Sequence, residues 1–140
     1  MTTPKNLITI ETTVNAPIEK VWQYWVSPEH ITKWYNASDD WHTPKAENDI
    51  KTGGKFIFRM EAKDKSFGFD FSGIYTDVKT NERIALTMDD DRKATIIFTK
   101  TGNSTTVTEA FEAETTNSAE LQKTGWQSIL DNFKKYTESN

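Results

Sequence analysis

Hydrophobic and polar positions alternate along residues 7–14, and this period of two predicts a β-strand. The same period returns from Trp41 to Glu114, where Phe56, Phe58 and Met60 alternate with charged and other outward positions. Polar breaks at 64–65, 79–82, 89–91 and 102–103 divide this stretch at hairpin-like intervals. We therefore expect about six further strands in one antiparallel sheet. The inward rows of these strands are Phe67, Phe69, Phe71, Gly73 and Tyr75; Ile84, Leu86 and Met88; Ala94, Ile96 and Phe98; and Val107, Glu109 and Phe111.

Helical spacing replaces this period in three places. Pro17 and Glu19 begin one short helix, and the Ser27-Pro28-Glu29 run supplies the cap, first position and first-turn acid of a second that ends near Tyr35. Asn117 and Glu120 have the spacing of a cap and its third-position acid, and they begin a long amphipathic helix, although the polar end at 137–140 is expected to fray. The apolar stripe of this helix is Leu121, Gly125, Trp126, Ile129, Leu130, Phe133 and Tyr136.

This order of elements predicts an α+β helix-grip fold. A curved antiparallel sheet of about six to seven strands needs a cover, and the long C-terminal helix has the apolar face to supply it. Two short helices lie between the first two strands. Because no linker or repeat divides the chain, we expect residues 1–140 to form a single domain.

Composition narrows the functional classes. The net charge of −4 argues against a nucleic-acid partner, which would need clustered Lys and Arg. The chain has no cysteine, Met1–Asn6 lacks signal-peptide character, and no apolar run approaches the roughly 20 residues of a membrane span. We therefore expect a soluble, cytoplasmic protein without a membrane span, as a monomer or weak dimer. Its eight Phe, five Trp and four Tyr predict an aromatic-rich interior.

Four blocks of the sequence resemble the signature of a known family. They are Ala16-Pro17-Ile18-Glu19-Lys20-Val21-Trp22; Pro28-Glu29-His30 with Lys33-Trp34-Tyr35; Gly53-Gly54-Lys55-Phe56; and Gly125-Trp126 with Leu130. In this order they are similar to the family of the activator of heat-shock-protein-ninety ATPase, within the START-like (SRPBCC, pollen-allergen-like) superfamily. The resemblance covers nearly the whole chain. It implies the helix-grip fold, hydrophobic or lipid ligands, polyketide-cyclase-like relatives, and a chaperone partner with a role in stress response.

A helix-grip fold encloses a space between the sheet and the long helix, and we expect a small apolar, aromatic or lipid-like molecule to bind there without catalysis. The alternative is that the same aromatic side chains simply fill the core. Gly125, inside the helix, predicts room for the sheet or for a ligand. The side chains expected to line the site are Trp34, Trp41, His42, Phe56, Phe58, Met60, Phe69, Phe71, Tyr75, Met88 and Trp126.

Two further functions stay open. A small enzyme of polyketide-cyclase type would use His42 or Glu109 as its acid–base group, and a co-chaperone would stimulate a heat-shock-protein-ninety ATPase through its surface. Strand parity places Arg59 and Asp70 opposite their aromatic neighbours, in solvent. With His30 and His42 as its two histidines the chain predicts no metal site, and no nucleophile elbow, phosphate loop or dinucleotide motif predicts a cofactor.

Overall fold

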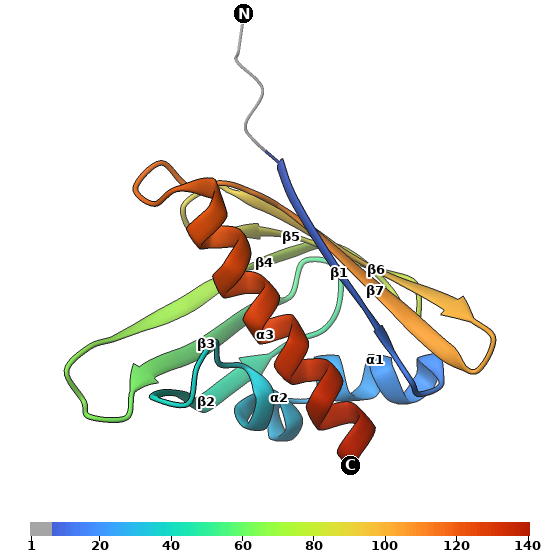
Figure 1. The fold of residues 1–140 in the computed structure, drawn as a ribbon. Helices are drawn as coiled ribbons and strands as arrows, with labels where there is room; N and C mark the ends of the chain where they lie inside the picture. The colour runs from blue at the N-terminus through green and yellow to red at the C-terminus, as the bar shows by residue number, and fades with distance from the viewer. Residues whose placement is uncertain (1–6) are drawn as a thin grey trace, which may run out of the picture.

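The computed structural model describes residues 7–140 and contains the predicted helices and strands. The chain forms a first strand, two short helices, six more strands and a long final helix (Figure 1). The elements are β1 (Leu7–Val14), α1 (Ile18–Val26), α2 (Pro28–Trp34), β2 (Trp41–Asn48), β3 (Lys55–Ala62), β4 (Gly68–Lys79), β5 (Arg83–Met88), β6 (Lys93–Thr101), β7 (Ser104–Glu112) and α3 (Ala119–Ser139).

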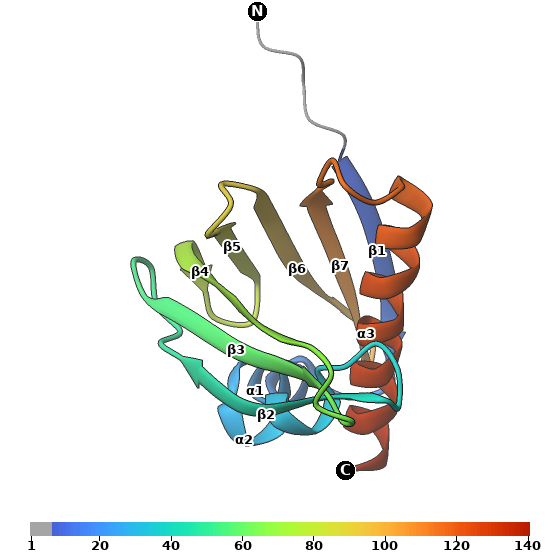
Figure 2. The same cartoon turned by 90° about the vertical axis from the view of Figure 1, so that its left-hand side faces the viewer.

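The seven strands form one antiparallel sheet in the order β1-β7-β6-β5-β4-β3-β2. The sheet curls around α3, which lies beside β1, while α1 and α2 close one end of the curl (Figures 1 and 2). This arrangement confirms the predicted α+β helix-grip fold. Its consequence is a concave sheet face covered by one helix, and the seam between them is where a cavity can form. No helix within residues 7–140 is long and apolar enough to cross a membrane.

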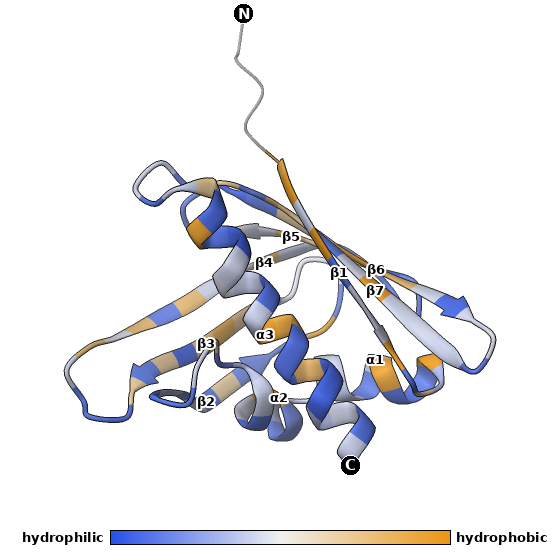
Figure 3. Cartoon of the chain, viewed as in Figure 1, coloured by the Kyte–Doolittle hydropathy of each residue, from blue (hydrophilic) through white to orange (hydrophobic). Residues whose placement is uncertain are grey.

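The core lies between the concave face and α3. Buried and less buried residues alternate strictly along β7, so Val107, Glu109 and Phe111 all point inward, as predicted. Hydrophobic and hydrophilic positions also alternate along β3 and β4, as Figure 3 shows. From the helix side, Leu130 and Phe133 are fully buried. Since an inward position on β7 is occupied by a carboxyl group, the core contains a polar side chain that needs an explanation.

The turn before β3 requires glycine. Gly53 has a φ of +86°, which L side chains rarely adopt. A Cβ on Gly54 would lie 2.0 Å from the carbonyl oxygen of Asp49. The pair therefore serves the backbone geometry of the turn.

The start and end of α3 differ from the prediction. The N-cap is Ser118, whose Oγ accepts a hydrogen bond from the Leu121 amide at 3.1 Å, so the assignment to Asn117 was wrong by one residue. Leu121 is 60% exposed, and Gln122 is the buried side chain of that turn. At the end that was expected to fray, the helix continues to Ser139; Thr137 is fully buried, and the Tyr24 hydroxyl donates to the backbone oxygen of Asn140 at 3.0 Å.

The inward row of β4 also differs at its start. Phe67 precedes the strand and is 62% exposed, and Phe69 is 39% exposed. The alternation shows which face of a strand points inward, but not how far the helix covers that face. The β3–β4 hairpin projects to one side, away from α3 (Figure 1). The two rings pack against Trp41 instead, with centroid distances of 6.0 Å in each case.

Candidate functional site

A small inner cavity of about 30 Å³ lies between the sheet and α3. Helices α1 and α2 contribute rings at one end, strands β3 to β7 contribute its floor, and α3 contributes one indole. The lining residues are Trp25, Trp34, Tyr35, Phe58, Phe71, Tyr75, Ile84, Leu86, Ile96, Glu109 and Trp126. Nearly all of this lining is apolar or aromatic.

Glu109 is the exception in this lining. Glu109 is only 7% exposed, and its carboxyl group takes part in no hydrogen bond or ion pair within residues 7–140. Burial disfavours the charged form and raises the pKa of the Glu109 carboxyl to about 8. At neutral pH most of this group is therefore protonated, although it is an acid in the middle of an aromatic cavity.

The two tyrosines that line the cavity differ in their hydrogen bonding. The Tyr75 hydroxyl donates to Oδ1 of Asn48 at 2.5 Å, and the Asn48 amide in turn donates to the Val26 carbonyl at 2.7 Å. The Tyr35 hydroxyl makes no hydrogen bond within the described part of the chain; burial, with a contribution from Glu109, raises its pKa well above the usual range. Tyr35 and Glu109 are thus the polar groups that a molecule in the cavity would meet unpartnered.

A larger outer pocket of about 250 Å³ adjoins the inner cavity. The two spaces share Tyr35, Phe71 and Trp126, which we call the ring partition. Ring centroids in the partition are 6.0 Å apart for Tyr35 and Phe71 and 6.1 Å for Phe71 and Trp126. Trp126 also stacks on Phe111 at 3.9 Å. The remaining residues of the outer pocket are Met60, Phe69, Arg92, Glu114 and Ile129.

Gly125, next to the ring partition, has free space around it. A Cβ built at this position would have no neighbouring atom within 4 Å. Close packing of the sheet against Gly125, one of the two predicted reasons for this glycine, is therefore wrong. The space beside the helix is the alternative that remains.

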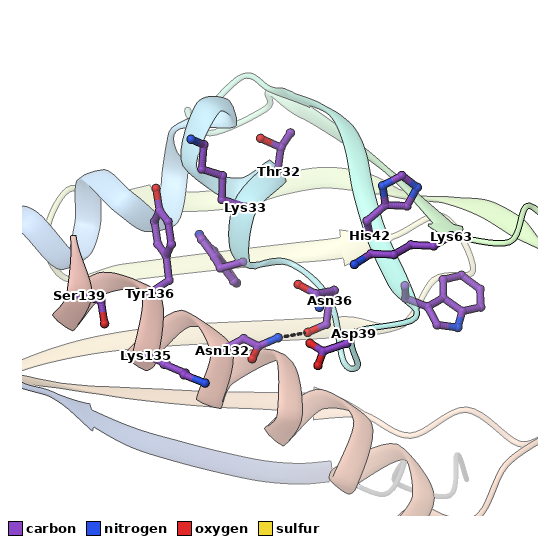
Figure 4. A pocket seen from close by; sticks show the side chains of 12 residues that line it. Thr32, Lys33, Asn36, Asp39, His42, Lys63, Asn132, Lys135, Tyr136 and Ser139 are labelled. Carbon is purple, nitrogen blue, oxygen red and sulfur yellow. Dashed lines mark hydrogen bonds between the residues drawn. The ribbon is translucent and has the colours of Figure 1, made fainter.

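A third space, the side cleft, has a volume of about 510 Å³ and lies outside the core (Figure 4). Its walls come from α2, the following loop, the start of β2 and the last turns of α3, and Lys63 and Lys135 approach it from opposite sides. Asn132 donates to the Asn36 carbonyl at 2.6 Å across its floor. The lining is Thr32, Lys33, Trp34, Asn36, Asp39, Trp41, His42, Lys63, Asn132, Lys135, Tyr136 and Ser139. This polar surface is distinct in character from the aromatic cavity.

The structure divides the predicted ligand-site residues among these spaces. Trp34, Phe58, Phe71, Tyr75 and Trp126 line the inner cavity. Met60 and Phe69 line the outer pocket, while Trp41 and His42 line the side cleft. Phe56 is 1% exposed and packs against Phe58, Phe71 and Tyr75. Met88 is buried and borders a surface hollow beside Asp89 and Arg92.

Five residues of the inner cavity were not predicted to line it. Ile84, Leu86 and Ile96 lie on inward rows that the alternation had already identified, and Trp25 lies on the apolar stripe of α1. Tyr35 is the C-cap residue of α2, where no periodic pattern gives the direction of the side chain. Alternation could therefore have identified the sheet residues, and nothing in the sequence identified Tyr35.

The two predicted acid–base candidates do not share a space. Glu109 lies in the inner cavity, whereas the His42 side chain is 43% exposed in the side cleft, with Nε2 3.9 Å from Glu61 Oε1. Arg59 and Asp70 form an exposed ion pair at 3.5 Å, as strand parity predicted. Residues 7–140 contain no cluster of three or more His, Cys, Asp or Glu side chains that could hold a metal ion.

The curled sheet, the gripping helix and the cavity between them define a START-like helix-grip protein. The chain belongs to the activator of Hsp90 ATPase homolog 1-like family, whose model matches residues 15–138. It is similar to Chr148 from Cytophaga hutchinsonii, with 56% identity over 95% of this chain and 92% of that one and a TM-score of 0.82. It is also similar to an AHSA1-like protein from Aeromonas hydrophila, with 43% identity, 96% and 93% coverage and a TM-score of 0.90.

A protein from Chromobacterium violaceum shares the fold at 24% identity, with 96% and 99% coverage and a TM-score of 0.86. No curated protein matches the chain.

Proposed function

We propose that this protein binds a small, largely apolar molecule at the seam between the sheet and α3. The observation that carries the proposal is the pair of adjoining spaces, because one ring partition separates an enclosed aromatic cavity from a pocket open to solvent. The body of the ligand would occupy the outer pocket, and one end would pass the partition into the inner cavity.

The volumes set the size of the ligand. At about 250 Å³ the outer pocket lies just below the roughly 300–1,000 Å³ of sites for drug-sized ligands. The inner cavity, at about 30 Å³, has room for one or two groups the size of a water molecule. The ligand is therefore expected to be about as large as a one- or two-ring aromatic compound, unless the partition moves.

Native mass spectrometry of the purified protein and titration with aromatic and lipid-like compounds, followed by tryptophan fluorescence, would test the proposal. Ile129→Phe places a bulkier side chain in the outer pocket and should weaken binding at least tenfold. Leu121→Phe makes a similar change on an exposed position of the same helix and should leave binding unchanged. Equal affinities of the two variants, or a clean apo mass with no response to any compound, would contradict the proposal.

A second candidate function is a small enzyme in which Glu109 is the acid–base group. Its support is the position of the Glu109 pKa near neutrality, where general acid–base catalysis is most effective. Glu109→Gln should abolish turnover of a substrate found by screening, whereas His42→Ala should not. The reverse result would move the reaction to the side cleft.

Family membership supports a third candidate, a co-chaperone-type interaction with a heat-shock-protein-ninety homologue. The test is the ATPase rate of the host's own homologue with and without this protein. An unchanged rate, together with no complex in size-exclusion chromatography, would argue against it.

A further inference from the structure

We propose that the ligand carries a protonated amine, and that Glu109 binds this group in the inner cavity. The inference rests on the proposed function and specifies the chemical class of the molecule. It starts from a side chain that is more than nine-tenths buried, faces a cavity and lacks a partner within residues 7–140. Burying such a group without a hydrogen bond destabilises the fold, and a ligand that supplies the partner removes that penalty.

The inner cavity is large enough for a small polar head group of the ligand but too small for its apolar body. Its roughly 30 Å³ is close to the space of one small polar group. Two unpartnered acceptors face it, the Glu109 carboxyl and the Tyr35 hydroxyl, while the Tyr75 hydroxyl already donates to Asn48. An ammonium group has several donors and no acceptor, so it complements these two oxygens.

The aromatic lining selects for positive charge. Trp25, Trp34 and Trp126 all line the inner cavity, and indole rings attract cations through their faces. A ligand carboxylate would instead place its negative charge against the negative faces of these rings, and Glu109 would repel it whenever that carboxyl ionises. The ionisable groups that face Glu109 from the neighbouring elements are Tyr35 and Tyr75, both with a raised pKa, so within residues 7–140 no Lys, Arg or His side chain lines the site.

Protonation gives this proposal a specific signature. Because burial raises the pKa of Glu109 to about 8, an ammonium ligand must displace a proton when it binds at pH 7. Its affinity should therefore rise about tenfold between pH 6 and pH 7, with release of nearly one proton. A neutral alcohol of the same shape can bind the protonated carboxyl, and its affinity should stay flat over this range.

Isothermal titration calorimetry with the full chain tests this inference. The probes are 1-naphthylmethylamine, 1-naphthalenemethanol and 1-naphthoate, and the proteins are the wild type, Glu109→Gln and the control Glu11→Gln, an exposed carboxyl on β1. We expect the amine to bind the wild type and Glu11→Gln at least tenfold more tightly than the alcohol at pH 7.5, and Glu109→Gln to abolish that preference.

The outcomes separate the two proposals. If the alcohol or the naphthoate binds as tightly as the amine, or if the preference survives in Glu109→Gln, the amine assignment is overturned and the apolar pocket stands. If none of the three probes binds while another apolar compound does, the amine assignment is overturned and the apolar pocket stands; if no compound binds at all, the proposed function is overturned as well.

Discussion

Replacing Glu109 with glutamine should change the pH dependence of stability in a defined direction. The folded-state pKa of Glu109 is raised to about 8 from an ordinary value near 4.5, so the folded protein holds a proton that the unfolded chain releases as pH rises. Below pH 4.5 both states are protonated and the group has no effect. Between pH 4.5 and pH 8 it increasingly favours unfolding, and above pH 8 the penalty is constant.

The magnitude follows from the size of the shift. The full shift corresponds to about 5 kcal/mol above pH 8, and the part that accumulates between pH 5 and pH 8 is about 3 to 4 kcal/mol. Glutamine has nearly the same shape and does not titrate. The difference in free energy of unfolding, Glu109→Gln minus wild type, should therefore grow by that amount from pH 5 to pH 8.

Urea unfolding at pH 5, 6, 7 and 8, followed by far-UV circular dichroism, measures this difference directly. Other titrating groups cancel because they are shared by both proteins. Glu11→Gln, the exposed control, should give a difference that stays constant within about 0.5 kcal/mol. A constant difference for Glu109→Gln would show that this carboxyl has an ordinary pKa in the folded protein and would refute the reasoning about its burial.

Three further tests probe the packing by urea unfolding. Ser118→Ala removes the hydrogen bond that caps α3 and should cost about 1 kcal/mol, whereas a loss no larger than that of Thr116→Ala, on the exposed preceding loop, would contradict the cap assignment. Gly125→Ala should stabilise by up to about 1 kcal/mol because the helix has room for a methyl group, while Gly53→Ala, at positive φ, should destabilise by about 1 kcal/mol; the same sign for both would be inconsistent with this geometry. Thr137→Val should be neutral or stabilise by about 1 kcal/mol, since the buried hydroxyl has no partner within residues 7–140, and a clear loss of stability would indicate a hydrogen bond there.

The fold was predictable because its strands and helices have different periods. Alternation along β7 placed Glu109 on the inward face, and the structure places it there. The boundary of α3 was less predictable, because Asn117 and Ser118 are both good caps and only the backbone geometry selects between them. Periodicity therefore predicted which face of each strand or helix is buried more accurately than it predicted where the element begins or ends.

The site was predictable only in part. A period of two shows which residues share a face, so Phe58, Phe71 and Tyr75 were expected on the concave side and lie there. It does not show where the cover stops, which is why Phe69 is partly exposed. The unpartnered state of Glu109 depends on which donors fold back toward it from distant elements, and local sequence carries no information about that.

The pairing of β1 with β7 has a consequence for synthesis. Leu7 is opposite Glu112, and Val14 is opposite Thr105, so the first strand must find a partner roughly 100 residues further along the chain. At ribosomal rates of about 5 to 20 residues per second, that partner emerges about 5 to 20 seconds later. During this interval Ile8, Ile10 and Val14 have no native partner strand. We therefore expect β1 to be an early binding segment for a nascent-chain chaperone, and an early site of mispairing with another newly made chain.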